Sequence, residues 1–349
     1  MNDMQNVNET AKADRLSDLL IQEKANRRSN VAALARAWWV TSRMEYLPDA
    51  LVHVALPLLL VLRHEKWGAQ LFSLSLVGLA IWLLGHWVGS SLNCLADYPV
   101  DRLDSGHKSR LATAIDEAGA RPILIINLFE ALIATVASIW LALRLNKPLL
   151  ALFWLGGFLI AYLYSFEPVR FKRRNLLNPL ALMTIVYATP LLFVYHLLAP
   201  SWDRYDLTVL VIYLIQMIPM FLVDEVSDHD EDREMKVNNP CVTYGRAAVC
   251  WMAITLYALS CSLSLVIFVV KSQSRSGWVL GAAGLAGLIY VWVESEFLTL
   301  LRFSTRLSKP TSPAVRAELT QELKRFSKTP GWLVATSLGV MFLAAALIK

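Results

Sequence analysis

Long apolar runs, separated by short polar segments, cover most of the chain after residue 46. A helix that crosses the hydrocarbon core of a bilayer needs about 20 mostly apolar residues. Runs of nearly this length predict transmembrane helices over 47–63, 71–95, 122–143, 148–165, 179–199, 207–223, 247–270, 278–301 and 331–348. The pattern therefore predicts an all-α, polytopic membrane protein with a bundle of nine transmembrane helices.

The first 45 residues follow a different pattern. They are polar and contain no apolar core of the signal-peptide type. A short amphipathic helix is expected around Leu16, Leu19 and Leu20, and Trp38-Trp39 suits a membrane interface. Residues 1–45 are thus expected to form a cytoplasmic segment with an interfacial helix, followed by a transmembrane domain over 46–349.

The composition narrows the class of protein. Hydrophobic residues make up 56% of the chain and charged residues only 17%, whereas charged residues are about a quarter of a typical soluble domain. These values exclude an ordinary soluble globule, a disordered chain and a collagen-like chain. The four cysteines show no metal-site spacing and are interpreted as small apolar residues of helices: Cys94, Cys241, Cys250 and Cys261.

With nine spans, the basic residues divide unevenly between the two sides of the membrane. One side holds the N-terminal segment and every second loop, and it carries 25 of the 33 Lys and Arg residues. By the positive-inside rule, this side is cytoplasmic. The net charge of +5 is explained in this way without a nucleic acid as partner. The expected location is a bacterial inner membrane.

Two polar segments interrupt the apolar pattern on the cytoplasmic side. Each carries three oxygen-bearing side chains spaced four residues apart, and residues with this spacing share one face of a helix. The first acidic column follows the second span and consists of Asn93, Asp97 and Asp101. The second acidic column follows the sixth span and consists of Asp224, Asp228 and Asp232.

The acidic columns indicate a cation site. Carboxylates four residues apart repel one another on a helix, and carboxylates near lipid are costly, so a bound cation would stabilise them. Donor sets made only of oxygen favour Mg²⁺ or Ca²⁺ over zinc, and Mg²⁺ leaves coordination positions to substrate phosphates. Two facing columns would form a Mg²⁺-dependent clamp for a diphosphate. The alternative is that each column is an ordinary solvated acidic helix end.

Basic side chains follow each acidic column and the fourth span. The candidates for binding a diphosphate are Lys108, Arg110, Arg170, Lys172 and Lys236. Metal ions with Arg and Lys around a leaving diphosphate are the electrostatic arrangement that ionisation of a phosphate ester requires. The alternative is anchoring of the loops on the cytoplasmic side, which accounts well for Arg173 and Arg174.

These segments resemble the signatures of the UbiA superfamily of intramembrane prenyltransferases. The first acidic column resembles the family's NDxxDxxxD signature, with Cys94 at the usually acidic second position, and Asp228 with Asp232 resembles its DxxxD signature. A segment that resembles the family's YSxPPxRLK stretch lies between them and contributes Tyr164, Ser165, Pro168, Arg170 and Lys172. The resemblance covers about residues 35–349 and implies a bundle of nine helices.

The resemblance also implies a mechanism. An isoprenoid diphosphate binds through Mg²⁺ to both acidic columns and ionises to an allylic cation and diphosphate. The prenyl group then passes to a lipophilic acceptor, which is expected to be aromatic. The resemblance implies catalytic roles for Asp97, Asp228, Tyr164 and Lys172, and diphosphate contacts for the five basic candidates above. One departure is that Lys236 and Asn238 stand where the family tends to have Gly and Lys.

Two other functions stay open at this point. A terpene cyclase on the same fold would use the same two columns and trap the cation with a double bond of the substrate. A carrier of organic anions or phosphate would use the basic loops. Glu294 and Glu296, in the eighth span, either contact the acceptor, pair with Arg302 or lie near the interface. Residue spacing does not specify the donor's chain length.

Overall fold

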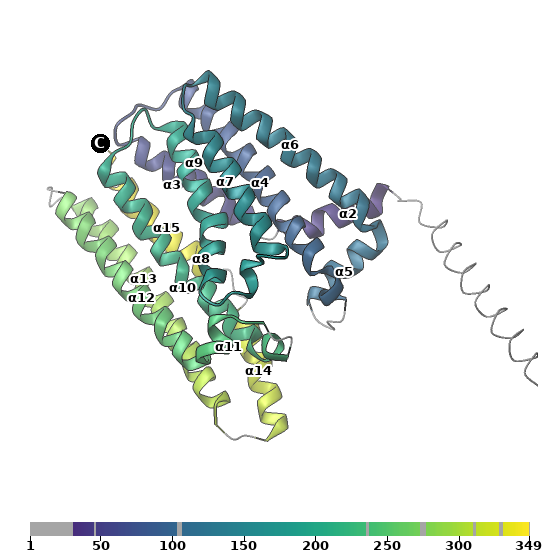
Figure 1. Ribbon diagram of the computed structural model, residues 1–349. Coiled ribbons are helices and arrows are strands. Elements are labelled where there is room, and N and C mark those ends of the chain that lie inside the picture. The colour runs from purple at the N-terminus through teal and green to yellow at the C-terminus, as the bar shows by residue number, and fades with distance from the viewer. Residues whose placement is uncertain are drawn as a thin grey trace, which may run out of the picture.

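The computed structural model of the chain describes residues 31–44, 47–102, 107–234, 237–272, 277–309, 312–327 and 331–348. The described residues form helices joined by short loops, without a β-strand (Figure 1). The all-α class is therefore confirmed. The expected amphipathic helix around Leu16, Leu19 and Leu20 lies outside the described residues.

The long helices follow the predicted spans closely. They are α3 (Leu47–Val61), α4 (Ala69–Asp101), α6 (Ala120–Arg144), α7 (Leu149–Ser165), α10 (Arg204–Glu234), α12 (Arg246–Lys271), α13 (Gly277–Leu307) and α15 (Gly331–Ala345). The predicted fifth span consists of three stacked pieces, α8 (Leu177–Met183), the π-helical turn η3 (Thr184–Ala188) and α9 (Thr189–Leu198). The wide turn precedes Pro190, which lacks the backbone N–H that an α-helix requires.

Six helices in the described part of the chain are long and apolar enough to cross a membrane. They occupy Ala69–Pro99, Ala120–Arg144, Leu177–Leu198, Arg204–Asp230, Arg246–Lys271 and Gly277–Leu307. Three shorter apolar helices, Leu51–Val61, Leu149–Ser165 and Trp332–Ala345, lie in the other three predicted spans. That all nine cross the membrane stays a prediction.

The helices pack into one bundle (Figure 1). α4 packs against α6, α10 against α12, α12 against α13 and α13 against α15, while α3 joins α15 to α9. Large aromatic side chains fill the interior, including the fully buried Tyr187, Tyr213, Tyr257 and Phe297. The outer faces of the helices expose many Leu, Val, Ile and Phe side chains, as expected for surfaces that face lipid.

Four shorter helices complete the fold, and three of them lie along the lower and right-hand margin of the bundle in Figure 1. These three are α5 (His107–Ala118), α11 (Pro240–Tyr244) and α14 (Pro313–Ser327). The fourth, α2 (Val31–Thr41), packs on α5. Leu111, Ala114 and Ile115 of α5 are buried in a small cluster with Ala37 and Val40 of α2. The loop that joins α6 to α7, by contrast, lies at the opposite end of α6 from α5.

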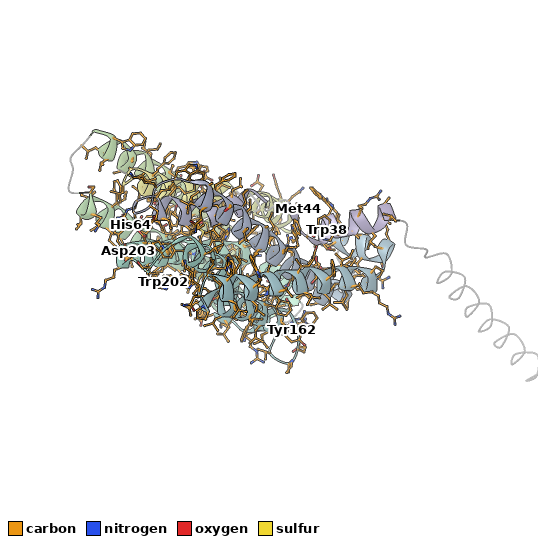
Figure 2. All side chains as sticks on the ribbon, turned by 90° about the horizontal axis from the view of Figure 1, so that it is seen from above. Trp38, Met44, His64, Tyr162, Trp202 and Asp203 are labelled. Carbon is orange, nitrogen blue, oxygen red and sulfur yellow. The ribbon has the colours of Figure 1, made fainter. Side chains whose placement is uncertain are left out.

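Away from α5, a buried ion pair ties three helices together. The Asp206 side chain at the start of α10 is fully buried; it accepts a hydrogen bond from Arg63 Nη1 at 2.5 Å and one from the Tyr195 hydroxyl at 2.9 Å. His64 and Asp203 lie beside it, well separated from Trp38 and Met44 in the view of Figure 2. This network fixes the ends of α3, α9 and α10 relative to one another.

Candidate functional site

The last turns of α4 and α10 converge at the end of the bundle that carries α5, α11 and α14. The loop between α7 and α8 contacts both segments: Arg170 and Lys172 pair with Asp97 on α4, and Asn175 hydrogen-bonds to Asn238 and Thr243, which follow the second acidic column. One loop therefore links the ends of both acidic columns, and the buried Tyr164 lies at its start, at the end of α7. The structure brings together two segments that lie more than a hundred residues apart in the chain.

The first acidic column occupies the end of α4 and is largely buried. Asp97 and Asp101 are each only 8% exposed. The side-chain oxygen of Asn93 is buried and accepts no hydrogen bond in the described part of the chain. A buried amide oxygen without a donor is costly, so this atom is available as a ligand for a cation. Cys94 points elsewhere: its thiol is buried and lies 3.7 Å from the Thr41 carbonyl oxygen.

Two cationic side chains neutralise Asp97. Arg170 Nη2 donates to one carboxylate oxygen at 3.0 Å, and Lys172 Nζ donates to the other. The backbone of Arg170 has a φ of 38°, in the left-handed region that residues other than glycine rarely adopt. The short 3₁₀ helix η2 (Phe171–Arg173) follows directly, so Arg170 and Lys172 reach the same carboxylate. The Arg170 Nε donor stays buried without an acceptor among the described residues.

The second acidic column lies on α10 and is more accessible. Asp224 is exposed, whereas Asp228 and Asp232 are half-buried. Asn239 Nδ2 donates to Asp232 at 2.7 Å and holds that carboxylate in place. The Ser227 hydroxyl donates mainly to the Asp224 carbonyl oxygen at 2.8 Å and lies 3.1 Å from the Asp228 carboxylate.

The short helix α11 begins at this column. Asn239 is its N-cap, and the Asn239 side-chain oxygen accepts from the Val242 amide at 2.8 Å. The same side chain thus caps α11 and orients Asp232. Cys241, in the first turn of α11, is fully buried, and burial raises the pKa of its thiol. This cysteine is therefore protonated and unreactive at neutral pH.

The remaining acidic residues of the α10 segment face other helices. Asp230 pairs with Arg246 of α12 at 2.9 Å and lies 4.0 Å from Arg316 of α14. Glu225 is buried and accepts a hydrogen bond from Asn178 Nδ2 of α8 at 2.6 Å. The acidic run therefore separates into the second acidic column and another set of side chains, Glu225 and Asp230, that join helices.

The predicted basic residues are placed unequally. Arg170 and Lys172 lie at the first acidic column, whereas Arg110 is exposed on α5. Lys108 is in α5 but its side chain is outside the described part, as is the whole of Lys236. On α5, Asp116 accepts a hydrogen bond from the Tyr98 hydroxyl of α4, so α5 is fastened to the helix that carries the first acidic column.

Sequence reasoning missed several residues that shape this site. An Asn followed by Pro, as in Asn239-Pro240, is a signal for a helix start, and it marks α11. Apolar residues at helical spacing, such as Leu111, Ile115 and Ala118, likewise mark α5. The pairing of Asn178 with Glu225 carries no local signal because it depends on how α8 packs on α10.

Two other acidic features are less suited to ligand binding. Ligand atoms of His64, Asp203 and Asp206 lie within 4.8 Å of one another, but Arg63 and Tyr195 already satisfy the Asp206 carboxylate, so we interpret this group as structural. Glu294 on α13 is half-buried, and its Oε2 atom has no hydrogen-bond partner among the described residues. It does not adjoin either acidic column in sequence or by any described contact.

Comparison with known proteins identifies the family to which the sequence belongs. The sequence matches the model of the UbiA prenyltransferase family over residues 50–300. None of the curated proteins matches the sequence.

Solved structures are similar to most of the chain. A digeranylgeranylglyceryl phosphate synthase has 15% identity and a TM-score of 0.58, with 90% of this chain and 99% of that chain covered. A UbiA homologue from Archaeoglobus fulgidus, solved with DMAPP and Mg²⁺, has 16% identity and a TM-score of 0.52, covering 84% of this chain and 96% of that one. The same homologue with GPP and Mg²⁺ has a TM-score of 0.53 at 16% identity, with coverages of 86% and 99%. At these identities the likeness establishes a shared fold.

Proposed function

The chain belongs to the UbiA prenyltransferase family and is an integral, multi-pass membrane protein, and from this premise we propose that it is a Mg²⁺-dependent prenyltransferase. The proposed reaction ionises an isoprenoid diphosphate and transfers the prenyl group to a lipophilic acceptor. The observation that carries this proposal is that one loop, between α7 and α8, pairs with Asp97 of the first acidic column and bonds to the segment that directly follows the second.

The donor set fits Mg²⁺. The proposed ligands are all oxygen atoms, from Asn93, Asp97 and Asp101 on α4 and from Asp224, Asp228 and Asp232 on α10. The buried Asn93 oxygen without a donor supports this role, and oxygen donors are what Mg²⁺ prefers. Bound Mg²⁺ would neutralise the negative charge that develops on the diphosphate when the bond between the diphosphate and the allylic carbon breaks. The relatives solved with DMAPP or GPP together with Mg²⁺ are consistent with this assignment.

Arg170 and Lys172 would hold the diphosphate. Both side chains contact Asp97, so they lie where phosphate oxygens would meet the first acidic column. A guanidinium binds phosphate oxygens with well-defined geometry, and the buried Nε of Arg170 is one donor still to be satisfied. Their positive charges would stabilise the leaving diphosphate in the transition state. Lys108, Arg110 and Lys236 are proposed as further diphosphate contacts from the neighbouring loops.

The interior beneath the site would protect the allylic cation. Aromatic rings contact one another in series from α4 through α3 to η3 and α10. His86 stacks on Trp82 and Trp82 on His53, with ring centroids 5.1 and 4.9 Å apart. The His53 ring is tilted against Tyr187 at 4.9 Å, and Tyr187 meets Phe221 edge to face at 5.8 Å. His86 lies two helical turns before Asn93 on α4. Aromatic faces attract cations and exclude water, which would otherwise convert the cation to an alcohol. Tyr164 is proposed as the catalytic aromatic residue closest to the ionising bond.

The site is proposed to face the cytoplasm of a bacterial inner membrane. This orientation rests on the unequal distribution of Lys and Arg, since the loops that carry both columns belong to the basic side. A carrier is disfavoured because both columns lie at one end of the bundle, whereas carriers place their substrate site near the midplane.

A product assay tests the proposal and separates transferase from cyclase. Purified protein is incubated with geranyl, farnesyl or geranylgeranyl diphosphate and Mg²⁺, with and without a phenolic acceptor, and products are identified by mass spectrometry. We expect diphosphate release with a prenylated acceptor, loss of activity in EDTA and recovery with Mg²⁺. A cyclic hydrocarbon or alcohol formed without acceptor would instead identify a terpene cyclase. Full turnover in EDTA would contradict the metal role.

A further inference from the structure

The loop between α7 and α8 is fastened at two places, and each place belongs to a different acidic column. At the first place, Arg170 and Lys172 pair with Asp97 of the first acidic column. Three residues after Lys172, Asn175 bonds to the segment that follows the second acidic column. The loop is therefore a short bridge between the two halves of the proposed site.

Asn175 makes the second fastening with both its backbone and its side chain. Its amide N–H donates to the Asn238 carbonyl oxygen at 2.5 Å, and its Nδ2 donates to Thr243 Oγ1 at 3.1 Å. The backbone of Asn175 has a φ of 44°, in the left-handed region that asparagine adopts more readily than most residues. Asparagine thus combines the backbone conformation that the loop requires with a side-chain donor.

The contacts continue from Thr243 to the second acidic column. Thr243 Oγ1 lies 3.0 Å from Asn238 Oδ1 and 2.8 Å from the Asn239 carbonyl oxygen. Asn239 in turn caps α11 and donates to Asp232 at 2.7 Å. A continuous series of hydrogen bonds, ion pairs and short chain segments therefore joins Asp97 on α4 to Asp232 on α10 through this loop.

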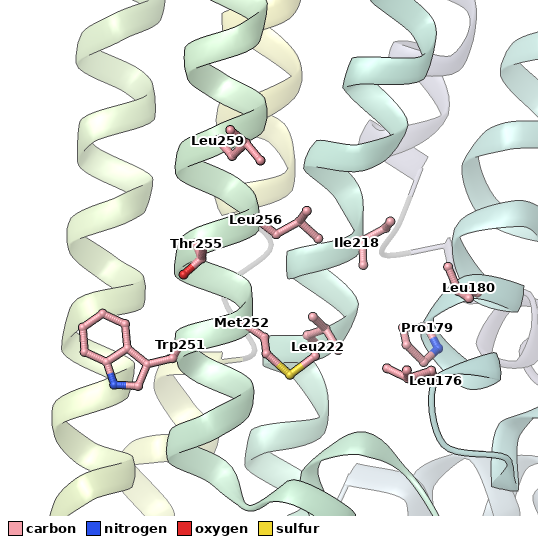
Figure 3. A pocket seen from close by; sticks show the side chains of 10 residues that line it. All are labelled: Leu176, Pro179, Leu180, Ile218, Leu222, Trp251, Met252, Thr255, Leu256 and Leu259. Carbon is pink, nitrogen blue, oxygen red and sulfur yellow. The ribbon is translucent and has the colours of Figure 1, made fainter.

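Apolar packing contributes little to holding the loop beyond Asn175. Leu176 is exposed and, with Pro179, lines a groove of about 620 Å³. Figure 3 shows both side chains on the other side of this groove from α12. Polar contacts hold this end of the loop instead, namely those of Asn175 and the hydrogen bond that Asn178 donates to Glu225 at 2.6 Å.

We propose that Asn175 is a positioning residue that sets the separation of the two acidic columns, so that one diphosphate with its Mg²⁺ can contact both. This inference rests on the proposed transferase function. Asn175 acts through Thr243 and the loop, since no described contact joins it to either column. A ligand that must contact both columns loses affinity when one of them moves by about 1 Å.

Distances between spin labels test the spacing without a ligand. Nitroxides are attached to the exposed positions Arg102→Cys, just after α4, and Arg233→Cys, on α10, while the buried native cysteines stay unlabelled. Pulsed electron paramagnetic resonance on the full chain in nanodiscs should give one narrow distance distribution. Asn175→Gly and Thr243→Val should each broaden it, whereas Thr243→Ser, which keeps the hydroxyl, should not. Because Thr243 is exposed, its variants should fold, and a native distribution in Thr243→Val would overturn the proposal.

Calorimetric binding of farnesyl thiolodiphosphate with Mg²⁺ tests the consequence for the site. Asn175→Gly and Thr243→Val should each weaken binding by about fivefold, the effect of about one lost hydrogen bond. The double variant should bind as the weaker single variant does, since both substitutions remove the same bond. A merely structural contact would instead lower the thermal unfolding temperature and leave the affinity of the folded protein unchanged, which would overturn the proposal.

Asn146 provides a matched control. It lies in the loop between α6 and α7 and also has a left-handed backbone, with a φ of 53°. Asn146→Gly should leave both the distance distribution and the affinity unchanged. Equal effects of Asn146→Gly and Asn175→Gly would overturn the proposal, because the added freedom of a glycine in a loop would then explain both.

Failure of the spacing and failure of the transferase function give different results. A broadened distance distribution in Asn175→Gly and Thr243→Val, in a protein that releases diphosphate from no donor, would support the spacing and remove the transferase function. Diphosphate release together with an unchanged distribution in both variants would support the function and remove the spacing.

Discussion

At the scale of single residues, the site depends on how buried charges are compensated. Asp97 is nearly buried, and an isolated carboxylate in such a place is costly. Arg170 and Lys172 remove that cost by pairing with it. The same three charges are proposed to reorganise around a diphosphate, so the ion pair marks the position of the ligand as well as stabilising the loop.

Arg170 provides the first test at this scale. Arg170→Gln removes a cation that is proposed to stabilise the leaving diphosphate, so kcat should fall by about 100-fold or more. The measurement is the rate of diphosphate release under saturating donor. Arg173→Gln, which removes the same charge from the same loop, should keep activity within about twofold because no described contact joins the half-buried Arg173 side chain to either acidic column. An equal loss of activity in both variants would show that the total positive charge of the loop, and not the position of Arg170, determines the rate.

Asn239 separates a structural role from a positioning role. Asn239→Ala removes both the cap of α11 and the donor to Asp232, so it should lower stability by about 1 kcal/mol and reduce activity. Asn239→Asp keeps a capping oxygen but places a second carboxylate beside Asp232. Because Asn239 is buried and the new carboxylate would repel Asp232, we expect a lower thermal unfolding temperature in EDTA than for the native protein, and a changed Mg²⁺ concentration for half-maximal activity. A normal Mg²⁺ dependence in Asn239→Asp would remove the positioning role.

Sequence reasoning selects site candidates where the signal is local. Asp97 and Asp228 stand out because carboxylates at helical spacing beside lipid need an explanation, and Arg170 and Lys172 stand out as cations in a signature-like segment. The partners of Glu225 and Asp116 could not be predicted, since each lies on another helix. The rotation of Cys94 toward α2 was equally hidden, because it depends on the packing of α2 and α5.

At the scale of helices, packing between small residues sets the arrangement around the site. A Cβ added at Gly157 of α7 would lie 2.8 Å from Thr189 Oγ1 and 3.2 Å from Thr189 Cβ on α9. Thr189 is β-branched and its hydroxyl bonds to the Thr184 carbonyl, so it cannot move aside easily. Gly157 therefore permits α7, which carries Tyr164, to approach the irregular η3–α9 segment.

Adjacent glycines give a controlled test of this contact. Gly157→Ala should destabilise the protein by about 1–3 kcal/mol through overpacking, measured as a lower thermal unfolding temperature in detergent. Gly156→Ala meets nothing within 4 Å and should be neutral or slightly stabilising, because alanine favours helix over glycine. If the two variants unfold at the same temperature, the close approach of α7 to α9 is not a source of stability.

At the scale of the whole molecule, hydropathy predicted every apolar helix, because hydrocarbon thickness imposes a length that can be counted along the chain. It did not predict the π-helical turn at Thr184–Ala188, because this irregularity follows from local packing. The helices α5, α11 and α14 at the site end of the bundle were treated as loops, since their amphipathic patterns are short.

The orientation of the bundle can be measured by accessibility of added thiols. All four native cysteines are buried, and the pKa of Cys241 is raised by burial, so they should not react with a membrane-impermeant maleimide. Glu117→Cys on α5 should react only after the cells are opened, because the proposed site end is cytoplasmic. Lys66→Cys, in the loop between α3 and α4, should react in intact cells because this loop belongs to the less basic, external side. The reverse pattern would invert the proposed topology.

The central claim is that both acidic columns hold one diphosphate through Mg²⁺, and calorimetric binding of farnesyl thiolodiphosphate, which resists ionisation, tests it most directly. Asp97→Asn and Asp228→Asn should each weaken Mg²⁺-dependent binding by about tenfold or more, and the double variant should be little weaker than the worse single variant, because residues that act as a unit are not additive. Independent, multiplying effects, or undiminished binding in EDTA, would contradict the claim.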